Sequence, residues 1–430
     1  MSRSKKAFDV ADLPALSTIP AITFALALFG SDAPASSLTV SALIFSITAT
    51  TLLAYSDARL QIWTIPFIAT WAALFGIHHF TGRASDGEHE YLMLLAGGCA
   101  FWLGRHGASS RRRRQRILNA IAIFAFLFAL YAFLQHAISP HYILGALKAY
   151  HRERLTGPFL SANTAATFFG LLFLLLVYRI VRHARLNSTN QSHSSVPGAV
   201  KNLLDQPMTF SAALLVMTCL VLTGSRAGFF AAAISIVILM IGFAFDLRSK
   251  GSARLQLSGW NIALVISSIV LTGLGIWSLS GATLETRMGL EGSGLDQRRV
   301  MIEASWAAGN WEPWLGHGLN SLDYATYFQT TAETNRAIVA QNASHNLFAQ
   351  WYMQAGWPGL IGVCAMILMS CMFALFSNQS ASIRGLRIAV IALVVSHGFF
   401  DYALEIPAFF LFFAFISGLL VSPNSYRAKN

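Results

Sequence analysis

Charged residues are scarce in this chain. Only 11 % of its 430 residues are Asp, Glu, Lys or Arg, whereas 55 % are hydrophobic, and the mean hydropathy is +0.55. Soluble domains carry about 25 % charged residues, so the composition excludes a soluble domain of this length and predicts a polytopic membrane protein. The four cysteines all lie in apolar runs without metal-ligand spacing, which makes them small packing residues: Cys99, Cys219, Cys364 and Cys371.

The sequence also lacks a Gly-rich nucleotide-binding loop, an internal repeat and a soluble domain. A transferase without a nucleotide site must take an already activated donor from elsewhere. No carboxylate cluster has the spacing of metal ligands, and the nearest candidates, Asp401 and Glu405, are interpreted as helix-end or structural residues. The sequence therefore predicts neither a metal nor a cofactor.

Apolar stretches long enough to cross a bilayer recur along the chain. They predict an all-α fold with about twelve membrane-spanning helices. The predicted spans are residues 14–30, 38–55, 60–80, 90–104, 117–138, 164–181, 207–224, 227–246, 259–281, 346–376 (broken), 385–401 and 405–421.

The distribution of charge predicts the orientation of these spans. With the N-terminus inside, 21 of the 30 Lys and Arg residues fall on inside segments and 14 of the 19 acidic residues fall outside. This positive-inside bias predicts that both termini are cytoplasmic. The basic run at residues 109–116, SSRRRRQR, is interpreted as a topology anchor, with lipid-headgroup or nucleic-acid binding as the alternatives.

The chain divides into three regions of one integrated membrane domain. Residues 1–281 hold about nine predicted spans, residues 282–344 form a long outside loop, and residues 345–430 hold the C-terminal spans. Residues 182–206 are polar and predict a flexible cytoplasmic linker. In the loop, residues 300–311 have apolar side chains at helical spacing, which predicts an amphipathic helix resting on the membrane.

Several arginines lie outside, against the topological trend. Arg226, in LTGSRAG, separates two apolar runs whose helices are expected to pack as an antiparallel pair. Its guanidinium either binds an anion beside the following helix start or reaches lipid phosphates. Arg154 precedes Asn163, the predicted N-cap of the next helix, and a surface ion pair with Glu153 is the alternative.

His345 is the strongest candidate for catalysis. Ser344 is predicted to cap a helix that begins at His345, which places the imidazole beside the positive end of the helix dipole and favours a neutral base. Taken alone, a histidine beside Asn346 is equally compatible with a structural role. His317 lies in a turn between two glycines, GHGLNSL, and is first interpreted as structural.

A break in the following span adds weight to His345. Nine residues separate Asn346 from the sequence Gly356-Trp-Pro-Gly359, which interrupts a helix. Within a membrane, such a break is tolerated only where the backbone lines a protein-buried or wet cavity. We therefore expect the break to mark a site.

At these residues, SHNLFAQWYMQAGWPG (344–359), the chain resembles the O-antigen ligase and polymerase family of bacterial envelope glycosyltransferases. Ligases of that family carry a His followed by Asn, Ser or Gln, then nine residues and GxxG. Four further stretches between residues 150 and 420 are similar to the family: GPFLSAN, LTGSRAG, the Arg298-to-Pro313 stretch leading into GHG, and DYALEIPA. Ala162 and Gln354 depart from the family pattern, which often has Pro and an acidic residue there.

The resemblance implies a GT-C-like glycosyltransferase of the bacterial inner membrane with its active site facing the periplasm. It implies that His345 takes part directly in transfer, that Arg226 and Arg298 bind the donor diphosphate, and that Arg154 assists. The sequence leaves open whether His345 is a base or only orients the acceptor. Asn346, His317 and Asn163 are the candidates for supporting residues.

The implied donor is an undecaprenyl-diphosphate-linked glycan, which is its own activated substrate, so neither nucleotide nor ATP is required. The implied acceptor is lipid A-core for a ligase, or a second lipid-linked glycan for a polymerase, which is the close alternative. Membrane lipids are the remaining partners, and no nucleic acid is expected. An amphiphile transporter is a more distant alternative, because transporters place ionisable residues near the bilayer midplane and most of these spans have none.

Overall fold

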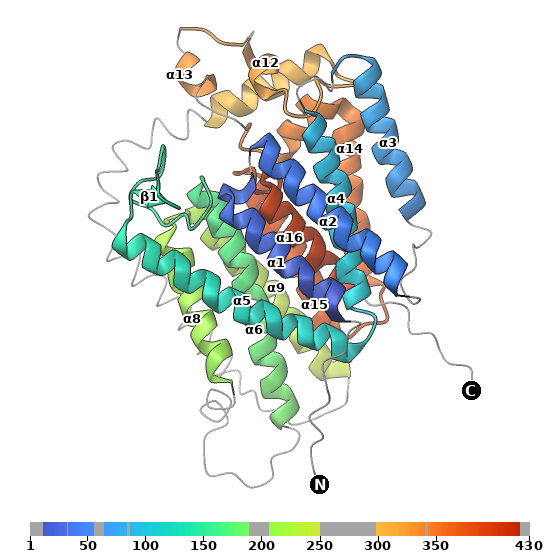
Figure 1. The fold of residues 1–430 in the computed structure, drawn as a ribbon, viewed down its shortest axis with the longest axis vertical. Helices are drawn as coiled ribbons and strands as arrows, with labels where there is room; N and C mark the ends of the chain where they lie inside the picture. Colours follow the sequence, from blue (N-terminus) through green and yellow to red (C-terminus); the bar gives the residue numbers. More distant parts are fainter. Residues whose placement is uncertain are drawn as a thin grey trace. The chain divides into compact units, whose positions relative to one another are not determined.

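The computed structural model describes residues 12–31, 33–55, 64–83, 87–188, 206–249, 298–327, 329–332, 334–339 and 343–421. These residues are mostly helical, as Figure 1 shows, which confirms the all-α prediction. A short antiparallel hairpin joins β1 (Tyr142–Ile143) to β2 (Ala146–Leu147). The predicted span at 259–281, most of the linker at 182–206 and the loop segment 282–297 lie outside the described residues.

The helices agree with the predicted multi-pass pattern. Among the described residues, six helices are long and apolar enough to cross a membrane: α2 (Pro34–Ala54), α5 (Arg111–Ile138), α6 (Ala162–Ser188), α9 (Arg226–Ser249), α14 (Leu347–Leu375) and α15 (Ala381–Gly398). Five others are shorter or less apolar: α1 (Leu13–Ala27), α3 (Thr64–Phe80), α4 (Glu88–Gly107), α8 (Pro207–Leu222) and α16 (Pro407–Leu420). Every predicted span except 259–281 coincides with one of these helices.

The described helices belong to two compact units. The first comprises residues 1–164, 318–320 and 403–430, and the second comprises residues 165–317 and 321–402. These units reflect which residues pack together. They do not test the predicted division of the chain after residues 281 and 344, which stays a prediction.

In the first unit, α4 and α16 pack closely, with α1 and α2 against α4 (Figure 1). Glycines permit this approach, because a Cβ added at Gly104 would lie 2.0 Å from the Phe415 carbonyl oxygen. The same holds on the facing helix, where a Cβ at Gly418 would lie 1.9 Å from the carbonyl oxygen of Phe101. The two backbones therefore touch without intervening side chains.

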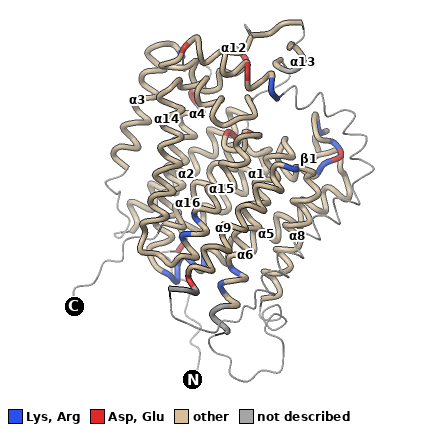
Figure 2. Tube along the Cα trace, turned by 180° about the vertical axis from the view of Figure 1, so that it is seen from behind, with Lys and Arg blue, Asp and Glu red and all other residues tan. Residues whose placement is uncertain are grey.

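The basic run at the start of α5, visible in Figure 2, fixes the N-terminal segment. Asp12, just before α1, is 1 % exposed and forms ion pairs with Arg113 (3.3 Å) and Arg116. The starts of α1 and α5 thus lie at the same end of the first unit. This agrees with the predicted spans, because an even number of membrane crossings separates the two helix starts. Beyond the predicted role as a topology anchor, these arginines neutralise a buried carboxylate.

In the second unit, α9 packs mainly on α15. The Asp246 carboxylate accepts a hydrogen bond from the Ala381 N–H (2.6 Å), and a Cβ at Gly242 would lie 2.7 Å from the Gly385 Cα. The two helices therefore run antiparallel. The helices that flank Arg226, α8 and α9, were expected to pack as an antiparallel pair; they are in contact, but the main partner of α9 is α15.

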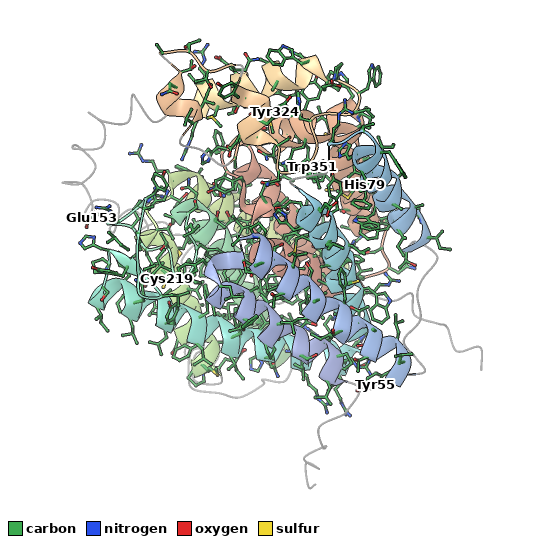
Figure 3. The ribbon with its side chains drawn as sticks, turned by 45° about the horizontal axis from the view of Figure 1, so that its top comes forward. Tyr55, His79, Glu153, Cys219, Tyr324 and Trp351 are labelled. Atoms are coloured by element: carbon green, nitrogen blue, oxygen red, sulfur yellow. The ribbon has the colours of Figure 1, made fainter. Side chains whose placement is uncertain are left out.

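The predicted amphipathic helix is present at residues 298–311. Its apolar residues join a buried cluster with α12 (Leu322–Tyr327), α13 (Asn335–Ile338) and α14: Met301, Ala304, Ala308, Leu322, Ala325, Ile338 and Met353. In Figure 3, Tyr324 on α12 and Trp351 on α14 mark this region. The apolar face therefore packs on protein, and contact of this helix with the membrane stays a prediction.

We expect Asp12→Asn to destabilise the first unit. The substitution removes the charge that neutralises Arg113, a side chain only 9 % exposed, and should lower the free energy of unfolding by about 1–3 kcal/mol. A melting curve in detergent measures this change. Glu88→Gln is the matched control, since its side chain is 60 % exposed and should have no effect. Equal melting temperatures for Asp12→Asn and the parent protein would contradict the structural role.

Candidate functional site

The predicted break in α14 is present at Ala355 and Gly356. Gly356 has φ 62° and ψ −161°, a conformation essentially restricted to glycine. In a regular helix the Trp357 N–H would bond to the Met353 carbonyl four residues earlier. Here that N–H donates instead to the carbonyl of Pro313 at 2.8 Å.

The GHG turn satisfies the other group that the break exposes. The His317 N–H donates to the Met353 carbonyl at 2.9 Å, and its ring Nε2 lies 2.8 Å from the Ala308 carbonyl oxygen. Gly316 has φ 66°, and a Cβ there would lie 2.4 Å from the Ala355 nitrogen. His317 therefore joins two helices through backbone contacts, which supports its structural interpretation, and a supporting role in catalysis stays a prediction.

α14 begins later than the sequence predicted. Its first residue is Leu347, and the N-cap is Asn346, whose side-chain oxygen accepts the N–H groups of Phe348 and Ala349, both at 3.0 Å. His345 consequently lies before the helix rather than in its first turn. The prediction erred because Ser344 and Asn346 are both good cap residues, and sequence alone does not show which side chain reaches the free amides.

Ser344 instead braces the turn that precedes the helix. Its N–H donates to the Gln350 side chain at 2.8 Å, and its hydroxyl donates to the Asn346 carbonyl at 3.0 Å. The Asn346 amide donates to the Phe399 carbonyl beyond α15 at 3.2 Å. These bonds hold His345 at φ 55°, a left-handed conformation that is uncommon for residues other than glycine and often found at functional sites.

His345 is largely buried beside a carboxylate. Its Nδ1 lies 3.9 Å from Oδ1 of Asp401, and its ring meets the Tyr402 ring edge-on with centroids 4.9 Å apart. Burial of the ring, and secondly the charge of Arg298, lower the pKa of His345 from 6.5 to about 4. The imidazole is thus neutral at pH 7, for a different reason than the predicted helix dipole.

Asp401 and His397 complete this cluster, and the sequence analysis did not place them in the site. Asp401 is 1 % exposed, and its Oδ2 lies 3.9 Å from Nδ1 of His397, one turn earlier. The same nitrogen lies 2.5 Å from the Thr167 hydroxyl on α6. The available signal was a histidine four residues before an aspartate at the end of an apolar span.

Arg226, the first residue of α9, lies at the same end of its helix cluster as His397. A Cβ at Gly228 would lie 2.6 Å from Ala166 on α6, and the neighbouring Thr167 contacts His397. Because α9 and α15 run antiparallel, the start of α9 meets the end of α15. The second unit therefore gathers three of the four predicted principal residues, His345, Arg226 and Arg298, around one end of α6, α9 and α15.

Arg154 and Asn163 belong to the first unit. One guanidinium nitrogen of Arg154 donates to the Asn163 side chain at 3.1 Å, and another lies 3.2 Å from His151 Nδ1. The predicted N-cap is wrong, because the Ser161 hydroxyl accepts the N–H groups of Asn163 (3.2 Å) and Thr164 (3.4 Å). Asn163 is thereby available to orient Arg154.

Further basic groups surround Arg154. Lys148 is 2 % exposed and donates to the Arg154 carbonyl at 2.9 Å, and burial lowers the pKa of its amine to about 8. Arg152 donates to the Lys148 carbonyl at 3.0 Å. Glu153, labelled in Figure 3, lies 3.6 Å from His141. This loop therefore concentrates positive charge near Arg154.

We expect Gly356→Ala to destabilise the site. An alanine there would be strained at φ 62°, and its Cβ would lie 2.6 Å from the Pro313 carbonyl oxygen. The free energy of unfolding should therefore fall by at least about 2 kcal/mol. Gly362→Ala on the same helix is the matched control. Its Cβ meets nothing within 4 Å, so stability should stay unchanged or rise by up to about 1 kcal/mol. Equal changes of melting temperature for both substitutions would contradict the packing of the break in α14 against the turn at residues 313–317.

Residues 211–364 match the sequence model of a family described as O-antigen ligase. The matched region contains Arg226, Arg298, His317 and His345, whereas Arg154, His397 and Asp401 lie outside it. No curated protein matches the chain significantly. The family match supports the resemblance inferred from the sequence: over residues 211–364 the chain is similar to the O-antigen ligase family.

Proposed function

We propose that the protein is an O-antigen ligase that transfers an undecaprenyl-diphosphate-linked glycan to lipid A-core. The observation that carries the proposal is the setting of His345. It is held in a left-handed backbone conformation before a broken helix, faces Asp401 and lies within the field of Arg298. Strained, buried and electrostatically perturbed side chains of this kind cluster at active sites.

His345 acts as the general base in the proposed reaction. The acceptor hydroxyl attacks the anomeric carbon of the donor glycan, the bond from that carbon to the diphosphate oxygen breaks, and the hydroxyl proton passes to His345. Its pKa of about 4 keeps the imidazole neutral and ready to accept a proton at pH 7. The Asp401 carboxylate, 3.9 Å away, then stabilises the imidazolium.

Arg226 and Arg298 bind the diphosphate in the proposed complex. Guanidinium groups match phosphate oxygens with paired donors and stabilise the charge that develops on the leaving diphosphate. Because the donor is already activated, the reaction consumes no ATP, and the arginine charges serve in place of a divalent cation. Arg154, oriented by Asn163, is proposed as a further donor-binding group.

The proposed site faces the periplasm of a bacterial inner-membrane protein. The support is the sequence distribution of charge, which leaves Arg154, Arg226 and Arg298 on outside segments against the positive-inside trend. Arginines retained on that side fit a role in binding an anionic donor.

Loss of the imidazole or of the Arg226 charge should abolish transfer. His345→Asn suits the left-handed backbone, since Asn tolerates it, and should lower kcat by at least about 100-fold. Arg226→Ala should lower kcat/KM by about 100-fold. Transfer by purified variants is measured with the undecaprenyl-diphosphate-linked glycan and lipid A-core, with melts to check folding. His79→Asn, an exposed histidine on α3, is the control, and full activity of folded His345→Asn would overturn the mechanism.

The acceptor distinguishes a ligase from a polymerase. The purified protein is given the same donor with either lipid A-core or a second lipid-linked glycan. Product on lipid A-core is expected. Product only on the second lipid-linked glycan would replace the ligase assignment with the polymerase alternative.

Removal of the Arg298 charge should change the pH dependence of transfer. Burial is the larger cause of the low pKa of His345 and the Arg298 charge is the smaller one, so Arg298→Gln should raise that pKa above about 4 while leaving it below 6.5. A base is inactive once protonated, so the acid limb of the kcat/KM profile should move to higher pH. Arg298→Lys retains the charge, so the acid limb of its kcat/KM profile should stay at the same pH as in the parent protein. An unshifted limb in Arg298→Gln would show that the limb does not report His345.

A further inference from the structure

His397 is a buried polar residue that the proposed chemistry does not use directly. It lies in the last turn of α15 and is 1 % exposed, and the preceding turns of the helix are mostly apolar. Burying an imidazole in an apolar span is costly unless its polar atoms find partners. Within the part of the chain that the structure describes, its Nε2 has no hydrogen-bond partner. Packing alone would be served better by an apolar side chain.

The other ring nitrogen faces two oxygens. Nδ1 of His397 lies 2.5 Å from the Thr167 hydroxyl and 3.9 Å from Oδ2 of Asp401. An imidazole nitrogen that faces a carboxylate and a hydroxyl is favoured as the N–H donor, because a lone pair there would repel the carboxylate. The Thr167 hydroxyl, at hydrogen-bond distance, holds the ring, and Oδ2 of Asp401 lies 3.9 Å from the same nitrogen, on the positive side of the N–H dipole.

Asp401 lies between two imidazoles and presents one oxygen to each. Oδ1 lies 3.9 Å from Nδ1 of His345, and Oδ2 lies 3.9 Å from Nδ1 of His397. Rotation of the carboxylate about its Cβ–Cγ bond would move both oxygens together. Whatever fixes Oδ2 consequently fixes the direction of Oδ1 toward His345.

We propose that His397 is a positioning residue for glycan transfer, which acts through Asp401 by holding its carboxylate turned toward His345. The proposal rests on the proposed function, because it assigns a role within that reaction. Thr167 contributes by holding the His397 ring from α6. Orienting groups of this kind, one step removed from the reacting atoms, set the tautomer and direction of the group that does the chemistry.

The role is tested by asking whether His397 works through Asp401. His397→Leu should lower kcat about 10-fold with KM unchanged, since substrate binding does not involve this side chain. His397→Asn places an amide donor where Nδ1–H lies and should restore kcat to within about threefold of the parent. In an Asp401→Asn background, His397→Leu should cause no further loss, because residues that act in one chain of contacts are not additive.

The controls separate this inference from the proposed function. Ser396→Ala removes a neighbouring hydroxyl that bonds only to its own helix and should leave kcat unchanged. If His397→Leu does not fold, Thr167→Val, which removes the hydroxyl that holds the His397 ring, takes its place in the cycle with Asp401→Asn. An equal, additive loss in both backgrounds, or a loss that tracks the melting temperature and is not rescued by Asn, would overturn the positioning role. Full transfer by His345→Asn would instead overturn the proposed function.

Discussion

The structure of the site depends on satisfying the backbone groups that a broken helix exposes. At the break in α14 the Trp357 N–H and the Met353 carbonyl lose each other as partners. The turn at residues 313–317 supplies one acceptor and one donor in their place, which avoids a cost of several kcal/mol for each group left bare in an apolar setting. The short helical segment before the break is thereby held against the preceding loop, and its cap positions His345.

Close backbone contact brings the other charged groups to this site. Gly242 and Gly385 let the backbones of α9 and α15 touch, and Gly228 on α9 accommodates the small side chain of Ala166 on α6. Because these helices approach each other closely, their ends align. Arg226 and His397 are gathered at one end as a consequence.

The electrostatics of the site follow from burial combined with fixed positive charge. Burial removes the solvation of an imidazolium, and Arg298 opposes the same charge, so His345 is neutral at physiological pH. Asp401 acts in the opposite sense once a proton arrives. These properties suit the proposed role of His345, removal of a proton from a weakly acidic hydroxyl.

The sequence by itself determined the membrane class, the positions of nearly all described helices and the break in α14, and it singled out His345, Arg226 and Arg298 as candidates. These follow from hydropathy, from glycine and proline, and from short motifs of adjacent residues, all of which are local properties. Only the tertiary structure decided the cap at Asn346, the protein partner of the amphipathic helix, and the pairing of Asp401 with His345 and His397. Periodicity shows which face of a helix is apolar but not what covers it, and contacts between distant residues depend on how helices pack, which hydropathy does not encode.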